Sequence, residues 1–249
     1  MIPVLIEPRV APSLSGGANE GIGRWIARAR SVGYDGFVME IPNNDKFPGW
    51  PDIQREVQVE ALRFTIYTRK TLLLDDRRSV KTRLAGIRGR SRADVICVRS
   101  SSMEVLNFVA KDSRVDIIRL ETQDEINAFN DGIASLAGQN GTFIELPFSP
   151  LVHTRGASRS KFIRSCNKIL ETCNAYHARL LFSSDAERLV DVKNAWQKAI
   201  VLQILLDAVS KQIGREIAIK NPTALIERCK GKKDALAVVS TGMAEDDPA

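Results

Sequence analysis

Short, almost continuously apolar segments alternate along the chain with longer segments of helical periodicity. Apolar runs without alternating polar residues are typical of strands buried on both faces, as in a parallel sheet. Seven segments have this pattern, with β-branched or aromatic content: Pro3–Ile6, Gly36–Ile41, Arg63–Thr68, Asp94–Val98, Val115–Leu120, Thr142–Leu146 and Ala178–Phe182. The pattern predicts seven parallel strands.

The segments between the strands carry apolar residues at helical spacing. They predict helices over Asn19–Ser31, Asp75–Arg88, Ser102–Lys111, a stretch beginning at Thr122, Ser158–His177 and Asp191–Ile213. Ser102 is a candidate N-cap, and Thr122 precedes acidic residues that suit a first turn. The last of these helices is expected to pack a long apolar stripe, including Trp196, against the core.

Repeated strand–helix units without a long linker predict one α/β domain. We expect a single TIM-like barrel over residues 1–234, with seven strands or as a distorted eight-stranded form. A doubly wound open sheet is the alternative. Glu216–Lys220 could supply an eighth strand, whereas Asn221–Pro222 favours a turn before a final helix. Residues 235–249 are acidic and rich in small residues, and we expect a flexible tail there.

Composition narrows the class of protein. The 249 residues carry a net charge of +6, and no apolar run is long enough for a membrane span. No signal peptide is visible, so a cytoplasmic location is expected. The four cysteines form no C-x-x-C pair and are expected to be buried thiols: Cys97, Cys166, Cys173 and Cys229.

Positive charge is concentrated in two segments. Residues 69–92 contain nine basic and two acidic residues, and residues 149–170 contain five basic residues and no acid. Arginine and lysine in such loops can reach phosphates, which favours RNA or DNA as the partner. With few aromatic residues expected on the surface, recognition of the backbone and shape of structured RNA is favoured over base stacking. The RNA-binding candidates are Arg69, Lys70, Arg88, Arg90, Arg92, Arg155, Arg159, Lys161 and Arg164.

Catalytic chemistry has little support in the sequence. Acidic residues at the predicted strand ends could cluster as a weak hard-cation site, or could cap helices and pair with arginines. These residues are Glu7, Glu40, Glu121, Glu145 and Asp185. The two histidines, His153 and His177, do not follow a strand end, and no phosphate-binding or nucleophile motif is present. We therefore assign no catalytic or metal-binding residue.

The stretch from FIELPFSP through the basic loop to Ser183–Ser184–Asp185–Ala186 resembles the protein component 3 family of ribonuclease P. The strand VDIIRLET and the segment NPTALIERCK match the family in pattern and order. The resemblance implies a barrel related to metal-dependent phosphoesterases of the polymerase-and-histidinol-phosphatase type. Those relatives carry an H-x-H pair in the first strand and a histidine after the SSDA-like motif. Here the first strand reads VLIEPRV and Glu187 follows Ala186, so Ser183, Ser184 and Asp185 are implied to be a vestigial barrel-mouth site.

The resemblance also implies a function. The chain would be a subunit of ribonuclease P that binds the catalytic RNA and assists removal of the 5′ leader from precursor tRNA. The implied partners are the RNA, the precursor tRNA and other protein subunits, especially the Pop-five-type subunit. The chain would bind no cofactor itself, while Mg²⁺ would be held largely by the RNA. A divergent metal-dependent phosphoesterase is the alternative, and another anionic partner is a third possibility. Phe47, Trp50 and Trp196 are candidates for a protein interface, with core packing favoured for Trp196.

Overall fold

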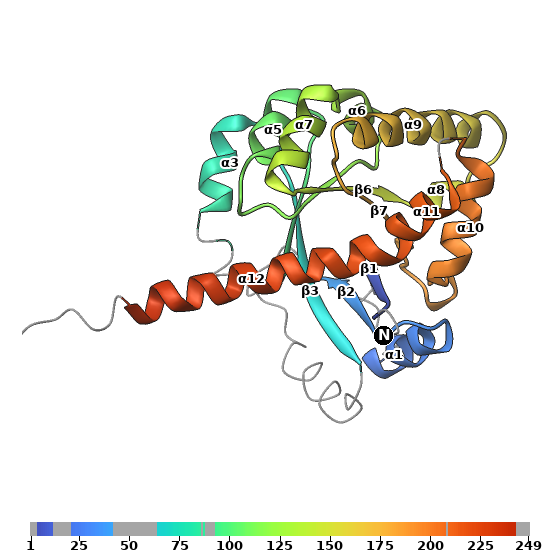
Figure 1. Ribbon diagram of the computed structural model, residues 1–249, viewed down its shortest axis with the longest axis horizontal. Helices are drawn as coiled ribbons and strands as arrows, with labels where there is room; N and C mark the ends of the chain where they lie inside the picture. Colours follow the sequence, from blue (N-terminus) through green and yellow to red (C-terminus); the bar gives the residue numbers. More distant parts are fainter. Residues whose placement is uncertain are drawn as a thin grey trace, which may run out of the picture.

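The computed structural model describes residues 4–11, 21–41, 64–85, 87, 93–207 and 209–242, with side chains described through residue 232. Seven parallel strands form one sheet in which each strand pairs with the next in sequence (Figure 1). They are β1 (Ile6–Val10), β2 (Gly36–Glu40), β3 (Thr65–Leu73), β4 (Val95–Arg99), β5 (Ile117–Arg119), β6 (Phe143–Pro147) and β7 (Leu180–Ser183). The predicted strands are confirmed in number and order.

A single bridge brings the two edges of the sheet together. Val10 pairs in parallel with Ala186, and the amide of Ala11 donates to the carbonyl of Ala186 (2.8 Å). The sheet is therefore a nearly closed barrel of the TIM type, and the open doubly wound alternative is wrong. No strand order reversal occurs among the described residues, and such a reversal defines a doubly wound sheet.

Two strands extend further than their apolar cores. β1 begins at Ile6 and continues through Glu7 and Arg9, although the sequence predicts a strand that ends at Ile6. β3 continues past Thr68 to Leu73 and so includes Arg69 and Lys70. The apolar pattern ends before the strands do, because the interior at this end of the barrel is filled by paired charges.

Helices cover the outside of the barrel, with α3, α5, α6, α7 and α9 in one layer (Figure 1). The bounds are α1 (Ile22–Ser31), α3 (Arg77–Leu84), α5 (Met103–Ala110), α6 (Gln123–Ala128), α7 (Asp131–Asn140), α8 (Ser149–His153), α9 (Gly156–Ala175), α10 (Ala195–Leu205), α11 (Lys211–Arg215) and α12 (Asn221–Gly242). Both predicted caps are confirmed. Ser102 caps α5, and Thr122 forms a capping box with Glu125 at the start of α6.

The single helix predicted over Asp191–Ile213 is wrong. Asp191 ends a short 3₁₀ helix, η1 (Leu189–Asp191), and Asn194 then caps α10 by accepting from the amide of Trp196 (2.8 Å). Ser210 caps α11 in the same way. Local side-chain caps thus divide a segment whose apolar spacing is continuous. Trp196 is 43% exposed on α10, so its predicted place in the core is also wrong.

Glu216–Lys220 forms neither an eighth strand nor a loop. It is a π-helical turn, η2, that joins α11 to α12, and Asn221–Pro222 opens α12 rather than a turn. Helical backbone is continuous from α11 through η2 into α12, so Pro222, which has no N–H to donate, lies just after the wider π turn. Ile217, Ala218 and Ile219 are all buried, which accounts for the apolar composition of this segment.

α12 covers the amino-terminal end of the barrel. Leu225, Ile226 and Cys229 pack into the interior cluster formed by side chains of the strands, including Phe143 and Leu181. Thr223 Oγ1 donates to the carbonyl of Val4 (2.8 Å), just before β1, and Lys232 Nζ binds Asp116 Oδ1 (2.7 Å), just before β5. One end of the barrel is thus apolar and covered, which leaves the carboxyl ends of the strands as the polar mouth.

α12 continues through Gly242, so helical backbone extends into the segment that the sequence predicts as a tail, while residues 243–249 lie outside the described ones. The four cysteines are buried, as predicted, and none of them forms a disulfide with another described residue. Among the described helices, none is both long and apolar enough to cross a membrane.

Candidate functional site

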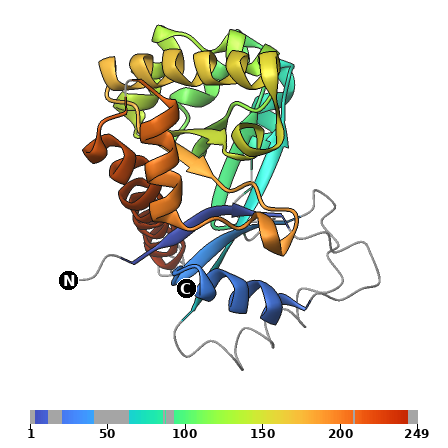
Figure 2. The ribbon, with the colours of Figure 1, turned by 90° about the vertical axis from the view of Figure 1, so that its right-hand side faces the viewer.

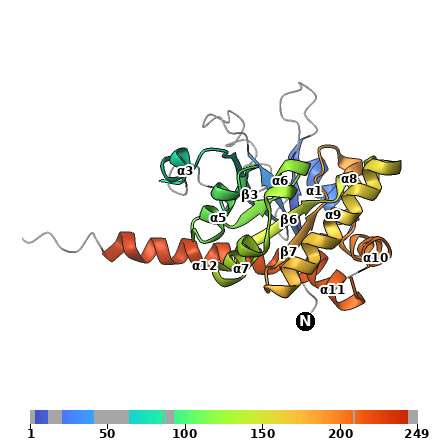
Figure 3. The same cartoon turned by 90° about the horizontal axis from the view of Figure 1, so that it is seen from above.

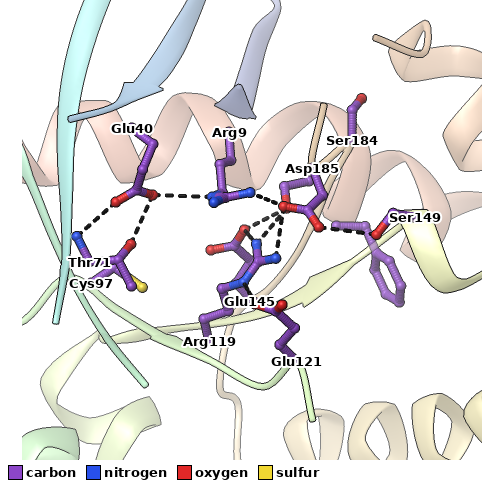
Figure 4. A network of polar contacts seen from close by, with 12 residues as sticks. Arg9, Glu40, Thr71, Cys97, Arg119, Glu121, Glu145, Ser149, Ser184 and Asp185 are labelled. Carbon is purple, nitrogen blue, oxygen red and sulfur yellow. Dashed lines mark hydrogen bonds and ion pairs between the residues drawn. The ribbon is translucent and has the colours of Figure 1, made fainter. Parts of the chain in front are cut away.

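Charged side chains fill the mouth of the barrel, where the carboxyl ends of the strands meet (Figure 4). The acidic residues predicted at the strand ends all lie in this region, and each pairs with a basic side chain. Four of them share one network with three arginines: Glu40, Glu121, Glu145 and Asp185 with Arg9, Arg69 and Arg119. The prediction that these acids pair with arginines is therefore confirmed for these four, whereas Glu7 pairs with Lys198.

Glu145 of β6 lies at the centre of the network and is fully buried. Its carboxylate binds Arg69 Nη1 (2.5 Å) and Arg119 Nη1 (2.9 Å), and accepts a hydrogen bond from Ser183 Oγ (2.5 Å). Burial alone would raise the pKa of Glu145, but the two guanidinium groups and the hydroxyl lower it to about 2. Glu145 is consequently an anion over the whole physiological pH range.

Asp185, which follows β7, binds two arginines at once. Its Oδ1 pairs with Arg9 Nη1 and with Arg119 Nη2 (2.8 Å), and its Oδ2 accepts from Ser149 Oγ (3.0 Å). The backbone of Asp185 has φ of 55°, a left-handed conformation that few residues other than glycine adopt. In this conformation the carboxylate is bound by Arg9, Arg119 and Ser149.

Glu40 of β2 completes the network. It binds Arg9 Nε (3.1 Å) and Arg69 Nε (3.2 Å), and it accepts a hydrogen bond from the amide of Thr71 (2.9 Å). Burial lowers the pKa of Arg9, as do the positive charges of Arg119 and Arg69, while the carboxylates oppose this effect. Three guanidinium groups can lie this close together only because carboxylates separate them.

A second, separate charge pair closes the seam between β1 and β7. Lys198 of α10 is fully buried, and its Nζ binds Glu7 Oε2 (2.7 Å) and the carbonyl of Phe182 (3.2 Å). Glu7 also accepts from the amide and the hydroxyl of Ser184 (2.7 Å each). Burial, followed by the nearby Glu7 carboxylate, raises the pKa of Tyr34 well above its ordinary value. The side chain of Lys198 thus joins the first and last strands of the barrel.

The donor set at the mouth does not fit a metal ion. Within the part of the chain that the structure describes, no three His, Cys, Asp or Glu side chains are placed together as metal ligands. The mouth carboxylates are bound by guanidinium groups, so a divalent cation would have to displace them and lie beside their positive charges. His153 is the last residue of α8, and its Nε2 lies 3.5 Å from Asp191 Oδ1. His177 follows α9 on the surface. Neither imidazole belongs to the network at the mouth.

Ser183, Ser184 and Asp185, the residues implied to be a vestigial site, all take part in these networks. Ser183 donates to Glu145, Ser184 to Glu7, and Asp185 binds Arg9 and Arg119. Cys97 lies against the same network, where Arg69 Nη2 contacts its Sγ (2.9 Å). Burial raises the pKa of Cys97 to about 11, although Arg69 opposes the shift, so this thiol stays protonated.

The predicted RNA-binding residues separate into different environments. Arg69 is fully buried in the network, so its assignment to an RNA-binding surface is wrong: its charge is neutralised inside the barrel. Lys70 is half-buried on β3. Arg88, Arg90 and Arg92 lie outside the described residues.

The second predicted basic segment forms a surface along α9. Arg155 is exposed at the N-cap of α9, and Lys161 and Arg164 are exposed on the helix. Arg159 is half-buried and donates to the carbonyls of Thr154 (2.7 Å) and Val152 (3.3 Å), so part of its donor capacity is used within the protein.

The prediction of this surface omitted Lys168, although its position could be read from the sequence. Residues 161, 164 and 168 are spaced i, i+3 and i+7, which places them on one face of a helix. Lys168 is exposed, like the other two. We call Lys161, Arg164 and Lys168 the α9 basic stripe.

Comparison with known proteins assigns the chain to a family. The model of the RNase P subunit p30 family matches residues 6–234. The chain belongs to this family. Ribonuclease P protein component 3 of Methanosarcina mazei is 26% identical over 202 residues, which cover 78% of this chain and 80% of the relative. Ribonuclease P protein component 3 of Natronomonas pharaonis is 24% identical over 233 residues, which cover 87% and 94%. The resemblance drawn from the sequence is therefore confirmed.

The fold of this RNase P subunit p30 family member also occurs in a solved structure. A chain in the cryo-EM structure of archaeal ribonuclease P with mature tRNA superimposes with a TM-score of 0.71 at 15% identity, covering 90% of both chains. This similarity concerns the fold, and it extends over nearly the whole barrel.

The low pKa of Glu145 makes stability depend on pH in a defined direction. Its pKa in the folded protein, about 2, lies below the ordinary value of 4.5, so its contribution to stability is complete above about pH 5. That contribution is lost progressively as the pH falls from 4.5 toward 2. ¹³C NMR titration of the glutamate carboxyls should show one group with a midpoint near 2, and urea unfolding should show stability declining over the same interval.

One test variant and one control variant accompany this titration. Glu145→Gln should remove the low-pH resonance and destabilise the protein by about 3–5 kcal/mol, because two buried guanidinium groups lose their central anion. Glu227→Gln, an exposed change on α12, should leave both measurements unchanged. If every glutamate of the wild-type protein titrates above pH 3, the described network is incorrect.

Proposed function

We propose that this chain is a protein subunit of ribonuclease P. In this role it binds the catalytic RNA and assists removal of the 5′ leader from precursor tRNA, without cleaving the phosphodiester bond itself. Family membership, the relatives named ribonuclease P protein component 3 and the fold shared with a chain of the archaeal enzyme support this assignment. The RNA would hold the Mg²⁺ that the reaction requires, and no catalytic residue is assigned to this chain.

The observation that carries the proposal is a difference between two sets of basic residues. The mouth arginines are buried and paired with carboxylates, whereas no hydrogen bond or ion pair of the side chains of Lys161, Arg164 and Lys168 occurs among the described residues. The stripe extends about 10 Å along α9 at 1.5 Å per residue. Unpaired cations at this spacing suit a phosphate backbone, whose binding releases counterions and gains entropy.

A second basic surface lies on α3. Arg78, Lys81 and Arg83 are exposed there, while Arg77 is paired with Glu104 (2.6 Å). Arg88, Arg90 and Arg92 follow α3 in the sequence and lie outside the described residues, so they stay predicted RNA contacts. We propose that α3 and α9 contact the RNA together, since both lie in the same outer layer (Figure 1).

An apolar stripe on α10 supports a protein partner as well. Trp196, Ile200 and Ile204 are 43%, 55% and 75% exposed, and the i, i+4, i+8 spacing places them on one face. Figure 2 shows α10 on the outside of the barrel. Large apolar side chains gathered on one surface are typical of protein interfaces. Arg215 lies over the Trp196 ring (5.4 Å) and gives the stripe a positive rim that would suit a partner with acidic residues at its edge.

We propose that this stripe contacts another protein subunit of ribonuclease P, of the Pop-five type. The precursor tRNA would be bound by the assembled enzyme rather than by this chain alone.

Reconstitution tests the function directly. Ribonuclease P RNA and the remaining protein subunits are assembled with and without this chain, and cleavage of precursor tRNA is measured at limiting Mg²⁺. Omitting the chain should lower the cleavage rate by about tenfold or more, equivalent to about 1.4 kcal/mol of transition-state stabilisation. The isolated chain should leave precursor tRNA and small phosphate esters intact. Metal-dependent turnover by the isolated chain would instead support the phosphoesterase alternative.

The α9 basic stripe can be tested by removing two of its charges. Lys161→Gln combined with Arg164→Gln should weaken binding to ribonuclease P RNA about five- to tenfold at 0.15 M salt. The slope of log affinity against log salt concentration should become shallower by about 2, because two phosphate contacts are lost. The matched control, Lys211→Gln combined with Arg215→Gln on α11, removes the same charges elsewhere and should change neither quantity. An equal effect of the two double variants would show that only net charge matters.

The protein interface can be tested at its most exposed residue. Ile204→Glu should weaken binding of the Pop-five-type subunit by about tenfold or more, measured by isothermal titration calorimetry, because it places a charge in an apolar contact. Asn174→Glu adds the same charge at an exposed position on α9 and should leave the affinity unchanged. Undiminished binding by Ile204→Glu would exclude the α10 stripe from this interface.

A further inference from the structure

A hollow of about 750 Å³ lies on the outer layer of helices, between α5, α6, α7 and α9. Figure 3 shows these four helices side by side when the molecule is seen from above. Neither network described above contributes a residue to the wall of the hollow, although Gln123 follows the mouth residue Glu121 by two positions. The hollow is large enough to hold a nucleotide-sized group.

Four of the eight polar side chains that line the hollow are carboxamides, and the others are Asp131, Ser165, Lys168 and Thr172. The Asp131 carboxylate accepts from Thr172 Oγ1 (3.5 Å) and from the hydroxyl of Tyr176 (3.4 Å). The carboxamides come from three separate segments: Asn107, Gln123, Asn127 and Asn130. A carboxamide offers both donors and an acceptor, which is the pattern that the edge of a nucleobase presents. Four of them around one hollow suit a group that carries both hydrogen-bond donors and acceptors, such as the edge of a base.

Much of this hydrogen-bonding capacity is free. Within the described residues, no hydrogen bond is made by the side chain of Asn107. Gln123 Nε2 donates to Asn127 Oδ1 (2.9 Å), which leaves the Asn127 amide hydrogens and the Gln123 oxygen available. Asn130 Oδ1 caps α7 by accepting from the amide of Ile133 (3.0 Å), and its NH₂ group remains.

Apolar side chains form the rest of the wall. Ile126, Phe129 and Ile169 line the hollow beneath the carboxamides. A flat, weakly polar group such as a nucleobase has faces that suit apolar contacts and an edge that needs hydrogen bonds. The wall provides both kinds of surface in one place.

Lys168 connects the hollow to the α9 basic stripe. It lines the hollow together with Ser165 and Thr172, and it also follows Lys161 and Arg164 along the same face of α9. A phosphate backbone that follows the stripe therefore passes the rim of the hollow, with Lys168 between the two.

We propose that the hollow binds an unpaired nucleotide of the RNA, with the base against the carboxamides and the adjoining phosphate on Lys168. This inference rests on the proposed function, because it needs RNA on the α9 basic stripe. Sequence-specific contacts to RNA are made mainly to unpaired bases, whose edges are accessible outside a helix. The carboxamides would thus read a particular base, while the stripe binds the backbone without regard to sequence.

Chemical footprinting of the complex with ribonuclease P RNA from the same organism tests the proposal. Dimethyl sulfate modifies the pairing edges of unpaired adenine and cytosine, and a carbodiimide modifies those of uracil and guanine. The wild-type chain should protect at least one unpaired base. Asn107→Ala combined with Asn127→Ala should restore its reactivity at least about fivefold, while the hydroxyl-radical footprint on the backbone and the salt slope should stay unchanged, because no phosphate contact is lost.

A matched double variant controls for general effects. Gln139→Ala combined with Asn174→Ala removes two exposed carboxamides that do not line the hollow and should leave the protected base protected. Circular dichroism melting confirms that both double variants are folded. The proposal is overturned if no base changes reactivity with the Asn107 and Asn127 variant, or if the control variant gives the same change.

The same footprints distinguish failure of the α9 basic stripe from failure of the nucleotide site. If Lys161→Gln with Arg164→Gln leaves the backbone footprint intact, the RNA-binding surface of the proposed function is wrong. If that variant weakens the footprint while the carboxamide variant changes no base, only the nucleotide site is wrong.

Discussion

Burial of guanidinium groups at the barrel mouth is the constraint on which the arrangement of the strand ends depends. Arg69 and Arg119 have essentially no exposed surface, so each requires a carboxylate within the barrel. Glu145 lies between them and Asp185 accepts from Arg119, while Glu40 binds Arg69. This requirement explains why β3 continues through polar residues. The left-handed backbone at Asp185 occurs at the residue whose carboxylate binds both Arg9 and Arg119.

The same requirement applies to the seam where an eighth strand would lie in a complete TIM barrel. Among the described residues, one backbone bridge, between Val10 and Ala186, pairs the two edges of the sheet there. Side chains add to it: Ser184 donates to Glu7, and Lys198 reaches from α10 to Glu7 and to the carbonyl of Phe182. One face of α10 therefore packs against the seam, where Lys198 forms a buried ion pair with Glu7. The opposite face of α10 leaves Ile200 and Ile204 mostly exposed, which makes that face available to another protein.

The sequence predicts the barrel well because buried parallel strands leave a strong signal of continuous apolarity. It predicts which acids gather at the mouth, since strand ends of parallel sheets share one edge. It does not reveal that Arg69 points inward, because the alternation of a strand decides its direction and β3 extends beyond its apolar core. Asn194 and Ser210 likewise divide an apparently continuous helix through local caps that periodicity does not show.

Composition alone cannot separate arginines that stabilise a fold from those that bind a polyanion. Both kinds raise the net charge, yet a guanidinium already neutralised by carboxylates, like that of Arg69, adds almost nothing to the field outside the protein. Cations without counter-charges, such as Lys161 and Arg164, act on an approaching phosphate at full strength apart from screening by salt. Family members that keep the mouth network but vary the charges of α9 would therefore fold alike and present different fields to a polyanion, because the two properties depend on separate sets of residues.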